Sequence, residues 1–201
     1  MNETLNAMMD RRSIRRYKAE QVPDELLEQI LLAASYSPNA GNRQTTQMVV
    51  CQDGALNERL GRINKAAFHG RISDSTHYIS QDQPSIADDP SIVSAFYGAP
   101  TVVTLFGPKH FLYTEADCWI MAGSIALAAS ALGIGSCVLG RAEDTFASPL
   151  GQQVQRDWGI SEDYEAKAHI TLGYALDAVP ARKPRKYPNP IVIRKNIAAE
   201  G

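Results

Sequence analysis

The sequence predicts an α+β or mixed α/β sandwich, in which helices cover a central sheet. Two observations predict this class: helical segments are concentrated near the N-terminus, and the strands that follow are separated by helices. The chain has 201 residues, of which 44% are hydrophobic and 21% charged. This length suffices for one well-formed core but is short for two domains. We find no internal repeat or linker, so residues 1–201 are expected to form a single domain.

Two helices are expected before the first strand. One covers roughly Glu3 to Asp10. A stronger one begins at Asp24, because its apolar residues recur at helical spacing and Pro23 and Pro38 provide boundary signals. These apolar residues are Leu26, Leu27, Ile30, Leu31 and Ala34. The pattern predicts an amphipathic helix that packs on the core.

The middle of the chain supplies the first strands. The run TTQMVVC predicts a short strand, and a polar helix follows around Leu56 to Ala67. Residues 73–96 are expected to form a variable excursion or lid. Within this range, Ser73 to Asp89 is dense in Ser, Asp, Gln and Pro and has no clear period. The next run, APTVVTLFG, predicts a buried strand.

The segment from Thr114 to Leu132 predicts a helix that is apolar on nearly all sides. Such a helix belongs inside a core or at a large subunit interface, and its small residues would let another helix approach closely. These are Gly123, Ser124, Ala126, Ala129 and Ala131. GIGSCVLG then predicts a tight turn and a short strand, Leu150 to Trp158 a further helix, and AHITLGYAL the last strand.

Composition argues against several classes of function. With a net charge of -2 and a pI of about 6.1, the chain has no general attraction for nucleic acid or acidic membranes. We see no N-terminal signal peptide and no apolar run that could span a membrane, so a cytoplasmic location is expected. The 3 cysteines and 4 histidines show no metal-ligand spacing, and the cysteines are interpreted as buried thiols.

Sequence motifs assign no catalytic side chain. GIGSCVLG is not a dinucleotide-binding fingerprint, because Val138 stands where GxGxxG requires glycine and the run follows a helix. A Walker sequence and a GxSxG nucleophile elbow are both missing from the sequence, although composition alone leaves a Ser–His–Asp triad open.

Two basic clusters stand out in this slightly acidic chain. The first, DRRSIRRYK, contains Arg11, Arg12, Arg15, Arg16 and Lys18, and the second, ARKPRKYP, contains Arg182, Lys183, Arg185 and Lys186. Taken separately, each cluster is consistent with solvated surface charges. If the two segments meet in the fold, arginine forks from the first and the Lys183–Arg185 pair from the second would surround a phosphate dianion.

Five motifs follow one another along nearly the whole chain: DRRSIRRY, SPNAGNRQTTQMVV, the Ala-rich helix running into LGIGSCVLG, LGYA and RKPRK. In this order they resemble the nitroreductase-like FMN-dependent oxidoreductases. The resemblance implies a three-layer α+β sandwich with a mixed central sheet flanked by helices. It also implies an interlocked homodimer with FMN at the subunit interface, which passes electrons from NADH or NADPH to nitro compounds, quinones, enones or free flavins.

The resemblance further implies which residues contact FMN. The opening motif carries Arg11, Arg12, Ser13 and Arg15 to the flavin phosphate and ring edge, with Arg15 as the candidate cation beside the pyrimidine. The turn from the partner subunit matches Ser37, Pro38, Asn39, Ala40 and Asn42. The turn at the reactive edge matches Leu139, Gly140 and Arg141, and the terminal basic pair matches Lys183 and Arg185. No side chain is expected to be catalytic, because the flavin carries the chemistry.

The chain also departs from the family pattern. Gln44 to Gln47 replaces a Trp-containing run, and SIVSAFYGAP lacks the Asn and Lys that hold the pyrimidine side in larger members. Asn64 and Lys65 are too far upstream to align with that pair.

The main expectation is a ping-pong transfer of hydride from NAD(P)H through FMN to a nitroaromatic, quinone or enone acceptor. Two alternatives stay open. A specialised enzyme of the same fold would dehalogenate reductively or consume the flavin as a substrate. A non-catalytic module would use the basic segment to bind nucleic acid or another protein.

Overall fold

The computed structural model describes residues 2–68, 90–182 and 184. At its centre lies a sheet with the strand order β1-β2-β4-β3. The strands are β1 (Gln47–Cys51), β2 (Thr101–Pro108), β3 (Gly135–Leu139) and β4 (Tyr164–Gly173). Adjacent strands pair antiparallel. Parallel pairing enters at the edge of β3, where Ser13 forms an isolated bridge with Ser136.

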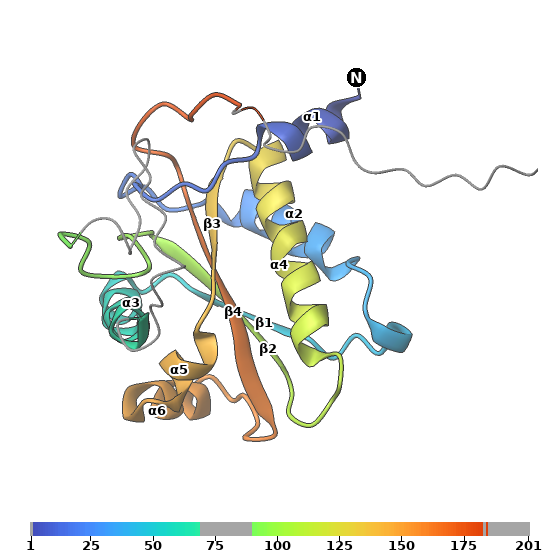
Figure 1. Cartoon of the computed structure of the whole chain (residues 1–201), viewed down its shortest axis with the longest axis vertical. Coiled ribbons are helices and arrows are strands. Elements are labelled where there is room, and N and C mark those ends of the chain that lie inside the picture. The colour runs from blue at the N-terminus through green and yellow to red at the C-terminus, as the bar shows by residue number, and fades with distance from the viewer. Residues whose placement is uncertain (1, 69–89, 183, 185–201) are drawn as a thin grey trace, which may run out of the picture.

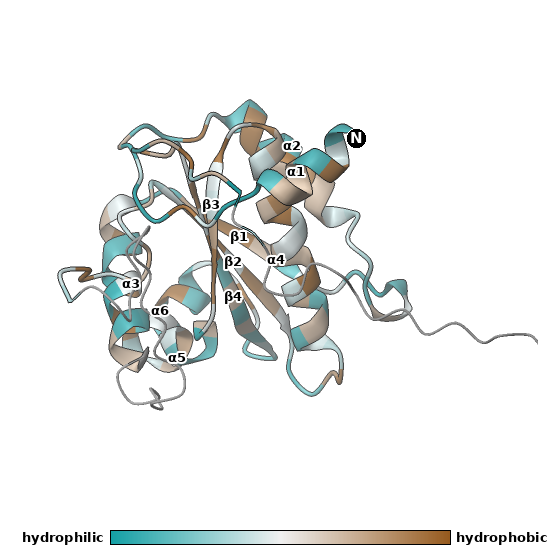
Figure 2. Cartoon of the chain, turned by 45° about the horizontal axis from the view of Figure 1, so that its top comes forward, coloured by the Kyte–Doolittle hydropathy of each residue, from teal (hydrophilic) through white to brown (hydrophobic). Residues whose placement is uncertain are grey.

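Helices cover both faces of the sheet and complete three layers (Figure 1). One face carries α2 (Asp24–Ser35) and α4 (Thr114–Ala131), with α1 (Glu3–Asp10) against α4. The other face carries α3 (Gly54–Phe68), α5 (Ala142–Ala147) and α6 (Pro149–Asp157). In Figure 2, hydrophobic residues lie along β1 at the centre, whereas the peripheral helix α3 mixes hydrophilic and hydrophobic residues. The α+β sandwich expected from the sequence is confirmed.

The period of two along the central strands divides the core between the two faces of the sheet. Val103 and Leu105 of β2 pack with residues of α2 and α4, whereas Val102 and Phe106 pack with residues of α3 and α5. All four side chains are at most 2% exposed. Burying a side chain of this size stabilises the fold by about 1.5–3 kcal/mol, so both helical layers are held by the same strand.

The helices and strands expected within the described residues are present, with bounds shifted by a few residues. Two further elements were not expected: α5 and the 3₁₀ turn η1 (Ala40–Asn42). Residues 73–89 of the expected excursion lie outside the described residues. Near the end of the excursion expected over residues 73–96, Ser94 and Phe96 are only 3% and 1% exposed. These two residues therefore belong to the core.

Helix α4 is buried on one side only. Ile125 and Ala129 are fully buried, whereas Trp119 and Ile120 remain 38% and 43% exposed. The nearly all-apolar helix predicted from the sequence therefore leaves a hydrophobic stripe uncovered in the single chain. None of the helices in the described ranges combines the length and the apolarity that a membrane span requires.

Candidate functional site

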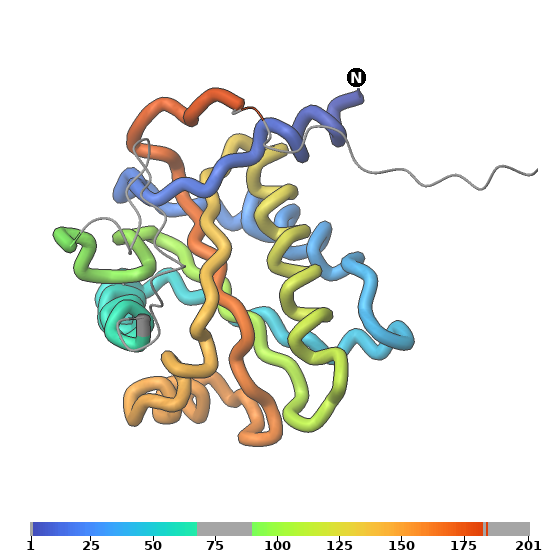
Figure 3. The backbone as a smooth tube through the Cα atoms, viewed as in Figure 1, coloured from blue at the N-terminus to red at the C-terminus, as the bar shows by residue number. Residues whose placement is uncertain are grey.

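The two segments that carry the basic clusters lie side by side in the fold. The backbone N–H of Lys18 donates to the Tyr174 carbonyl at 2.9 Å, and that of Leu176 donates to the Arg16 carbonyl at 3.0 Å. Figure 3 shows the N-terminal segment and the segment after β4 running together at one end of the molecule. The meeting of the two segments is therefore confirmed, while Lys183 and Arg185 themselves lie outside the described residues.

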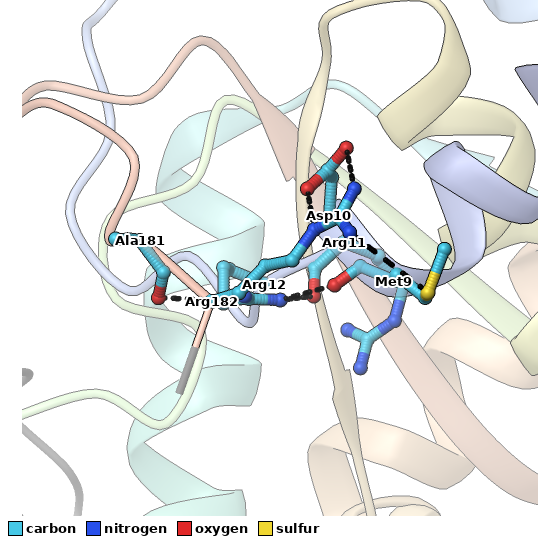
Figure 4. Close-up of polar contacts among 6 residues, drawn as sticks. All are labelled: Met9, Asp10, Arg11, Arg12, Ala181 and Arg182. Carbon is cyan, nitrogen blue, oxygen red and sulfur yellow. Dashed lines mark hydrogen bonds and ion pairs between the residues drawn. The ribbon is translucent and has the colours of Figure 1, made fainter. Parts of the chain in front are cut away.

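Two cations at this meeting point contact other groups of the protein (Figure 4). The Arg12 guanidinium donates to the carbonyls of Met9, Arg11 and Ala181 at 2.9, 2.7 and 3.3 Å. Arg182 forms a two-pronged ion pair with Asp10. This pairing lowers the pKa of the Asp10 carboxyl below its ordinary value. Arg12, which the resemblance assigns to FMN, has its donors directed at the protein's own carbonyls.

Ser13 lies against the edge strand β3, where it bridges to Ser136, the neighbour of Cys137, and Arg11 and Arg15 flank it along the same segment. The Ile14 N–H donates to the Ser136 carbonyl at 2.8 Å, which fixes the segment against the strand. Burial raises the pKa of the Cys137 thiol, and the Arg15 charge, hydrogen bonding from Ser13 and the Arg11 charge oppose that rise. Figure 4 shows the Arg11 guanidinium turned away from the bracing contacts. Three of the predicted residues are thus brought together.

The turn that follows β3 is held by Asn64 of α3. The Asn64 amide donates to the carbonyls of Gly140 and Arg141 at 2.9 and 3.2 Å, and to the Thr145 hydroxyl at 2.9 Å. Arg141, with a left-handed φ of 62°, donates in return to the Asn64 Oδ1 at 3.1 Å. Asn64 is fully buried and the adjacent Lys65 is 9% exposed.

Sequence reasoning set Asn64 and Lys65 aside, yet α3 brings Asn64 to the predicted Gly140–Arg141 turn. One signal could have indicated it: Asn57, Leu60, Gly61 and Asn64 share helical spacing. A polar residue that continues the buried face of an amphipathic helix needs a buried partner.

Trp119 of α4 reaches the same turn from the other side. A Cβ placed on Gly140 would lie 3.8 Å from the Trp119 ring. The half-exposed indole therefore stands beside the end of β3, where it walls one side of the predicted site.

The turn matched to the partner-subunit motif is held by hydrogen bonds and packs on α4. The Ala40 N–H donates to the Asp117 carboxylate at 3.0 Å, and the hydroxyls of Ser37 and Ser124 lie 2.7 Å apart. The Gln44 N–H donates to the Asn39 Oδ1 at 2.9 Å. This turn, which also contains Pro38 and Asn42, lies across α4 from the basic segment (Figures 1 and 3). One chain alone does not bring the two groups of predicted residues together.

Comparison with known proteins assigns the chain to a family. The model of the Nitroreductase family matches residues 8–174. The chain belongs to the nitroreductase family. Its fold resembles that of an FMN-bound nitroreductase from Desulfitobacterium hafniense, with a TM-score of 0.79 and 28% identity over 96% of this chain and 100% of the other.

Two curated relatives of this nitroreductase-family chain bear different names. Nitroreductase NfnB of Mycolicibacterium smegmatis is 28% identical over 83% of this chain and 80% of its own length. An iodotyrosine deiodinase of Thermotoga neapolitana is 22% identical over 92% of this chain and 94% of its own length. Both relatives span most of the chain, so the similarity is not confined to one motif.

The buried histidine of this family member is not an acid or base at the site. His169 is fully buried, and its Nδ1 lies 2.9 Å from the Thr104 hydroxyl. Burial, with a smaller contribution from the Arg141 charge, lowers the pKa of His169 to about 3. Within the described ranges, we find no group of three or more metal-ligating side chains. The cations and backbone N–H groups at the edge of β3 are of the kind that can bind an anion.

Proposed function

We propose that the chain is an FMN-dependent NAD(P)H oxidoreductase. In this proposal, hydride passes from NADH or NADPH by way of the flavin to nitroaromatic, quinone or enone acceptors in a ping-pong sequence. The observation that carries it is the cluster of Arg11, Ser13 and Arg15 at the edge of β3, in a chain of the nitroreductase family. The FMN-bound relative of known structure supports the choice of cofactor.

The donor set fits a flavin mononucleotide. A phosphate dianion needs several cationic or hydroxyl donors, which Arg11 and Ser13 can supply together with Lys183 and Arg185. The flavin ring needs neutral backbone at its reactive edge and a cation near its pyrimidine. Leu139, Gly140 and Arg141 supply the backbone, and Arg15 supplies the cation. Bound FMN would contribute the hydride chemistry itself, so the protein contributes binding and orientation.

Each residue near the cofactor has a defined task under this proposal. Arg11 and Ser13 bind the phosphate, and Arg12 holds the carbonyls around them in place. Asn64 fixes the Gly140–Arg141 turn.

A homodimer completes the site in this proposal. The turn with Pro38, Asn39, Ala40 and Asn42 lies across α4 from the basic segment of the same chain (Figure 1). It therefore serves the cofactor of the partner subunit. The exposed stripe of α4, with Trp119 and Ile120, supplies an apolar surface for the contact. A groove of about 700 Å³ between α1, α2 and α4 continues this surface.

An absorption spectrum tests the proposal. Protein loaded with FMN is expected to show flavin bands that bleach when NADH or NADPH is added without oxygen, and that return when a nitroaromatic or quinone acceptor follows. Repeated cycles with catalytic FMN would distinguish a bound cofactor from a consumed substrate. A colourless protein that also fails to take up added FMN would refute the assignment.

The deiodinase relative favours a second candidate function, reductive dehalogenation on the same fold. Halogenated phenols in place of nitro compounds in the same assay separate the two, because only a dehalogenase would release halide. The nucleic-acid-binding alternative loses support from the structure. The cations Arg12, Arg16 and Arg182 are engaged by the protein's own carbonyls and carboxylates.

A further inference from the structure

The basic segment forms an arch between two anchor points on the sheet. Ser13 bridges to Ser136 at the start of the arch, and Tyr17 bridges to Ala175 at its end. Arg15 lies between these anchors. The position of the Arg15 side chain over β3 therefore depends on the shape of the arch.

The Tyr17 hydroxyl closes this arch from inside. It donates to the Ile14 carbonyl at 2.6 Å, three residues back along the chain. It also lies 2.7 Å from the Thr171 hydroxyl of β4. The phenol has one proton, which goes to Ile14, so in the Tyr17–Thr171 contact the Thr171 hydroxyl is the donor. The same Thr171 hydroxyl also lies within donating distance, 3.3 Å, of the Cys137 carbonyl on β3. Both hydrogen bonds end on this one oxygen, so it ties the arch to the centre of the sheet.

The Tyr17 ring packs closely against its surroundings. A Cβ on Gly173 would approach the Tyr17 ring to 2.9 Å and Pro100 to 2.8 Å, so the absence of a side chain there makes room for the phenol. On the other side of the arch, a Cβ on Gly135 would meet Ile14 at 3.0 Å. Burial raises the pKa of the Tyr17 phenol, so the hydroxyl keeps its proton at neutral pH.

We propose that Tyr17 is a positioning residue whose hydroxyl holds the arch so that Arg15 stays beside the pyrimidine ring of the flavin. The inference rests on the proposed FMN site. A cation fixed in advance stabilises the negative charge of reduced flavin without reorganising, whereas a cation on a loose arch is shared with water. Tyr17 therefore acts on the reduced form more than on the oxidised form.

The test compares full-length variants by FMN affinity and by reduction potential, neither of which needs an acceptor. In Tyr17→Phe the ring remains and both hydrogen bonds are lost. Relative to wild type, we expect the affinity for reduced FMN to fall about tenfold more than the affinity for oxidised FMN. This change lowers the two-electron reduction potential by about 30 mV. Thr171→Val removes one of the two bonds and is expected to shift the potential in the same direction by less. Tyr164→Phe, at the far end of β4, serves as the matched control and should leave the potential unchanged.

The outcomes separate the inference from the proposed function. Failure of the wild-type protein to bind FMN would overturn the proposed function. If wild type binds FMN and Tyr17→Phe keeps its potential, the positioning role is refuted. It is equally refuted if Tyr17→Phe weakens the binding of oxidised and reduced FMN by the same factor, because an equal loss indicates a general loss of structure. Should Tyr17→Phe fail to fold, Thr171→Val decides by the same criteria, with Thr171→Ser expected to restore the wild-type potential.

Discussion

At the scale of single residues, the cations of the basic segment divide by what their guanidinium groups contact. Arg12 is directed at three backbone carbonyls, and Arg16 forms an ion pair with Asp177 at 2.9 Å. Arg11 points away from the bracing contacts (Figure 4). Residues of one type, separated by a few positions, therefore have different tasks, and the motif alone does not distinguish them.

Substitution of Arg11 and Arg12 should separate binding from bracing. Arg11→Ala is expected to weaken FMN binding by about 10- to 100-fold, because a charge-assisted contact contributes about 1.5–3 kcal/mol, with little change in melting temperature. Arg12→Ala should lower the free energy of unfolding of the apoprotein by about 1–2 kcal/mol, because part-buried hydrogen bonds are lost. Fluorescence titration with FMN and urea unfolding measure the two effects. The opposite pattern would exchange the roles of these residues.

His169 should make folding stability depend on pH. Its pKa is lowered to about 3 in the fold from an ordinary value of 6.5, so the unfolded chain binds more protons between these two values. The contribution of the neutral His169 to the free energy of unfolding is then fully present above about pH 6.5. It is lost as the pH falls toward 3, by about 1.4 kcal/mol per pH unit.

Urea unfolding between pH 7 and pH 4.5 measures the slope of the free energy of unfolding against pH. His169→Asn stays neutral throughout and is expected to flatten it, although the variant is less stable overall. His110→Gln changes an exposed histidine and should leave the slope intact. An unchanged slope in His169→Asn would assign the pH dependence to other groups.

At the scale of elements, the sequence was most informative where an apolar pattern ran long. α2 follows from apolar residues at helical spacing over 12 residues, and α4 follows from 18 residues that are apolar on nearly all sides. α5 has only 6 residues and begins after Arg141 in a left-handed conformation, so no period announces it. Asn64 was missed for another reason: its partner Arg141 is 77 residues away, and a one-dimensional pattern carries no information about such a contact. The Ser13 and Arg15 cluster could be anticipated because a family motif carries it.

The open face of α4 supports a prediction about assembly. Ile120 is 43% exposed on this face, and a buried charge there would be costly in a dimer but harmless in a monomer. Ile120→Glu is expected to give a folded monomer with much lower FMN content. Sedimentation velocity and flavin absorbance measure both. Leu112→Glu, at a residue that is 83% exposed outside α4, is the control and should remain dimeric. A dimeric Ile120→Glu protein would place the interface elsewhere.

At the scale of the whole molecule, the predicted site is divided by α4. The basic segment and the Gly140–Arg141 turn lie toward β3, while the turn around Asn42 lies across α4 from them (Figures 1 and 3). A site built from both halves therefore requires two chains. Each chain would give one half to its own cofactor and the other half to its partner's.

This division predicts complementation between two defective chains. Arg11→Ala damages the basic half, and Asn42→Gly removes a side chain of the turn while tolerating its φ of 51°. Each homodimer is expected to bind FMN weakly at both sites. In a heterodimer of the two variants, one site collects both defects and the other has none, so one site should bind with wild-type affinity. Differently tagged chains, purified in tandem and titrated with FMN, give the stoichiometry. If both halves instead came from the same chain, every site in the heterodimer would keep one defect and no tight site would appear.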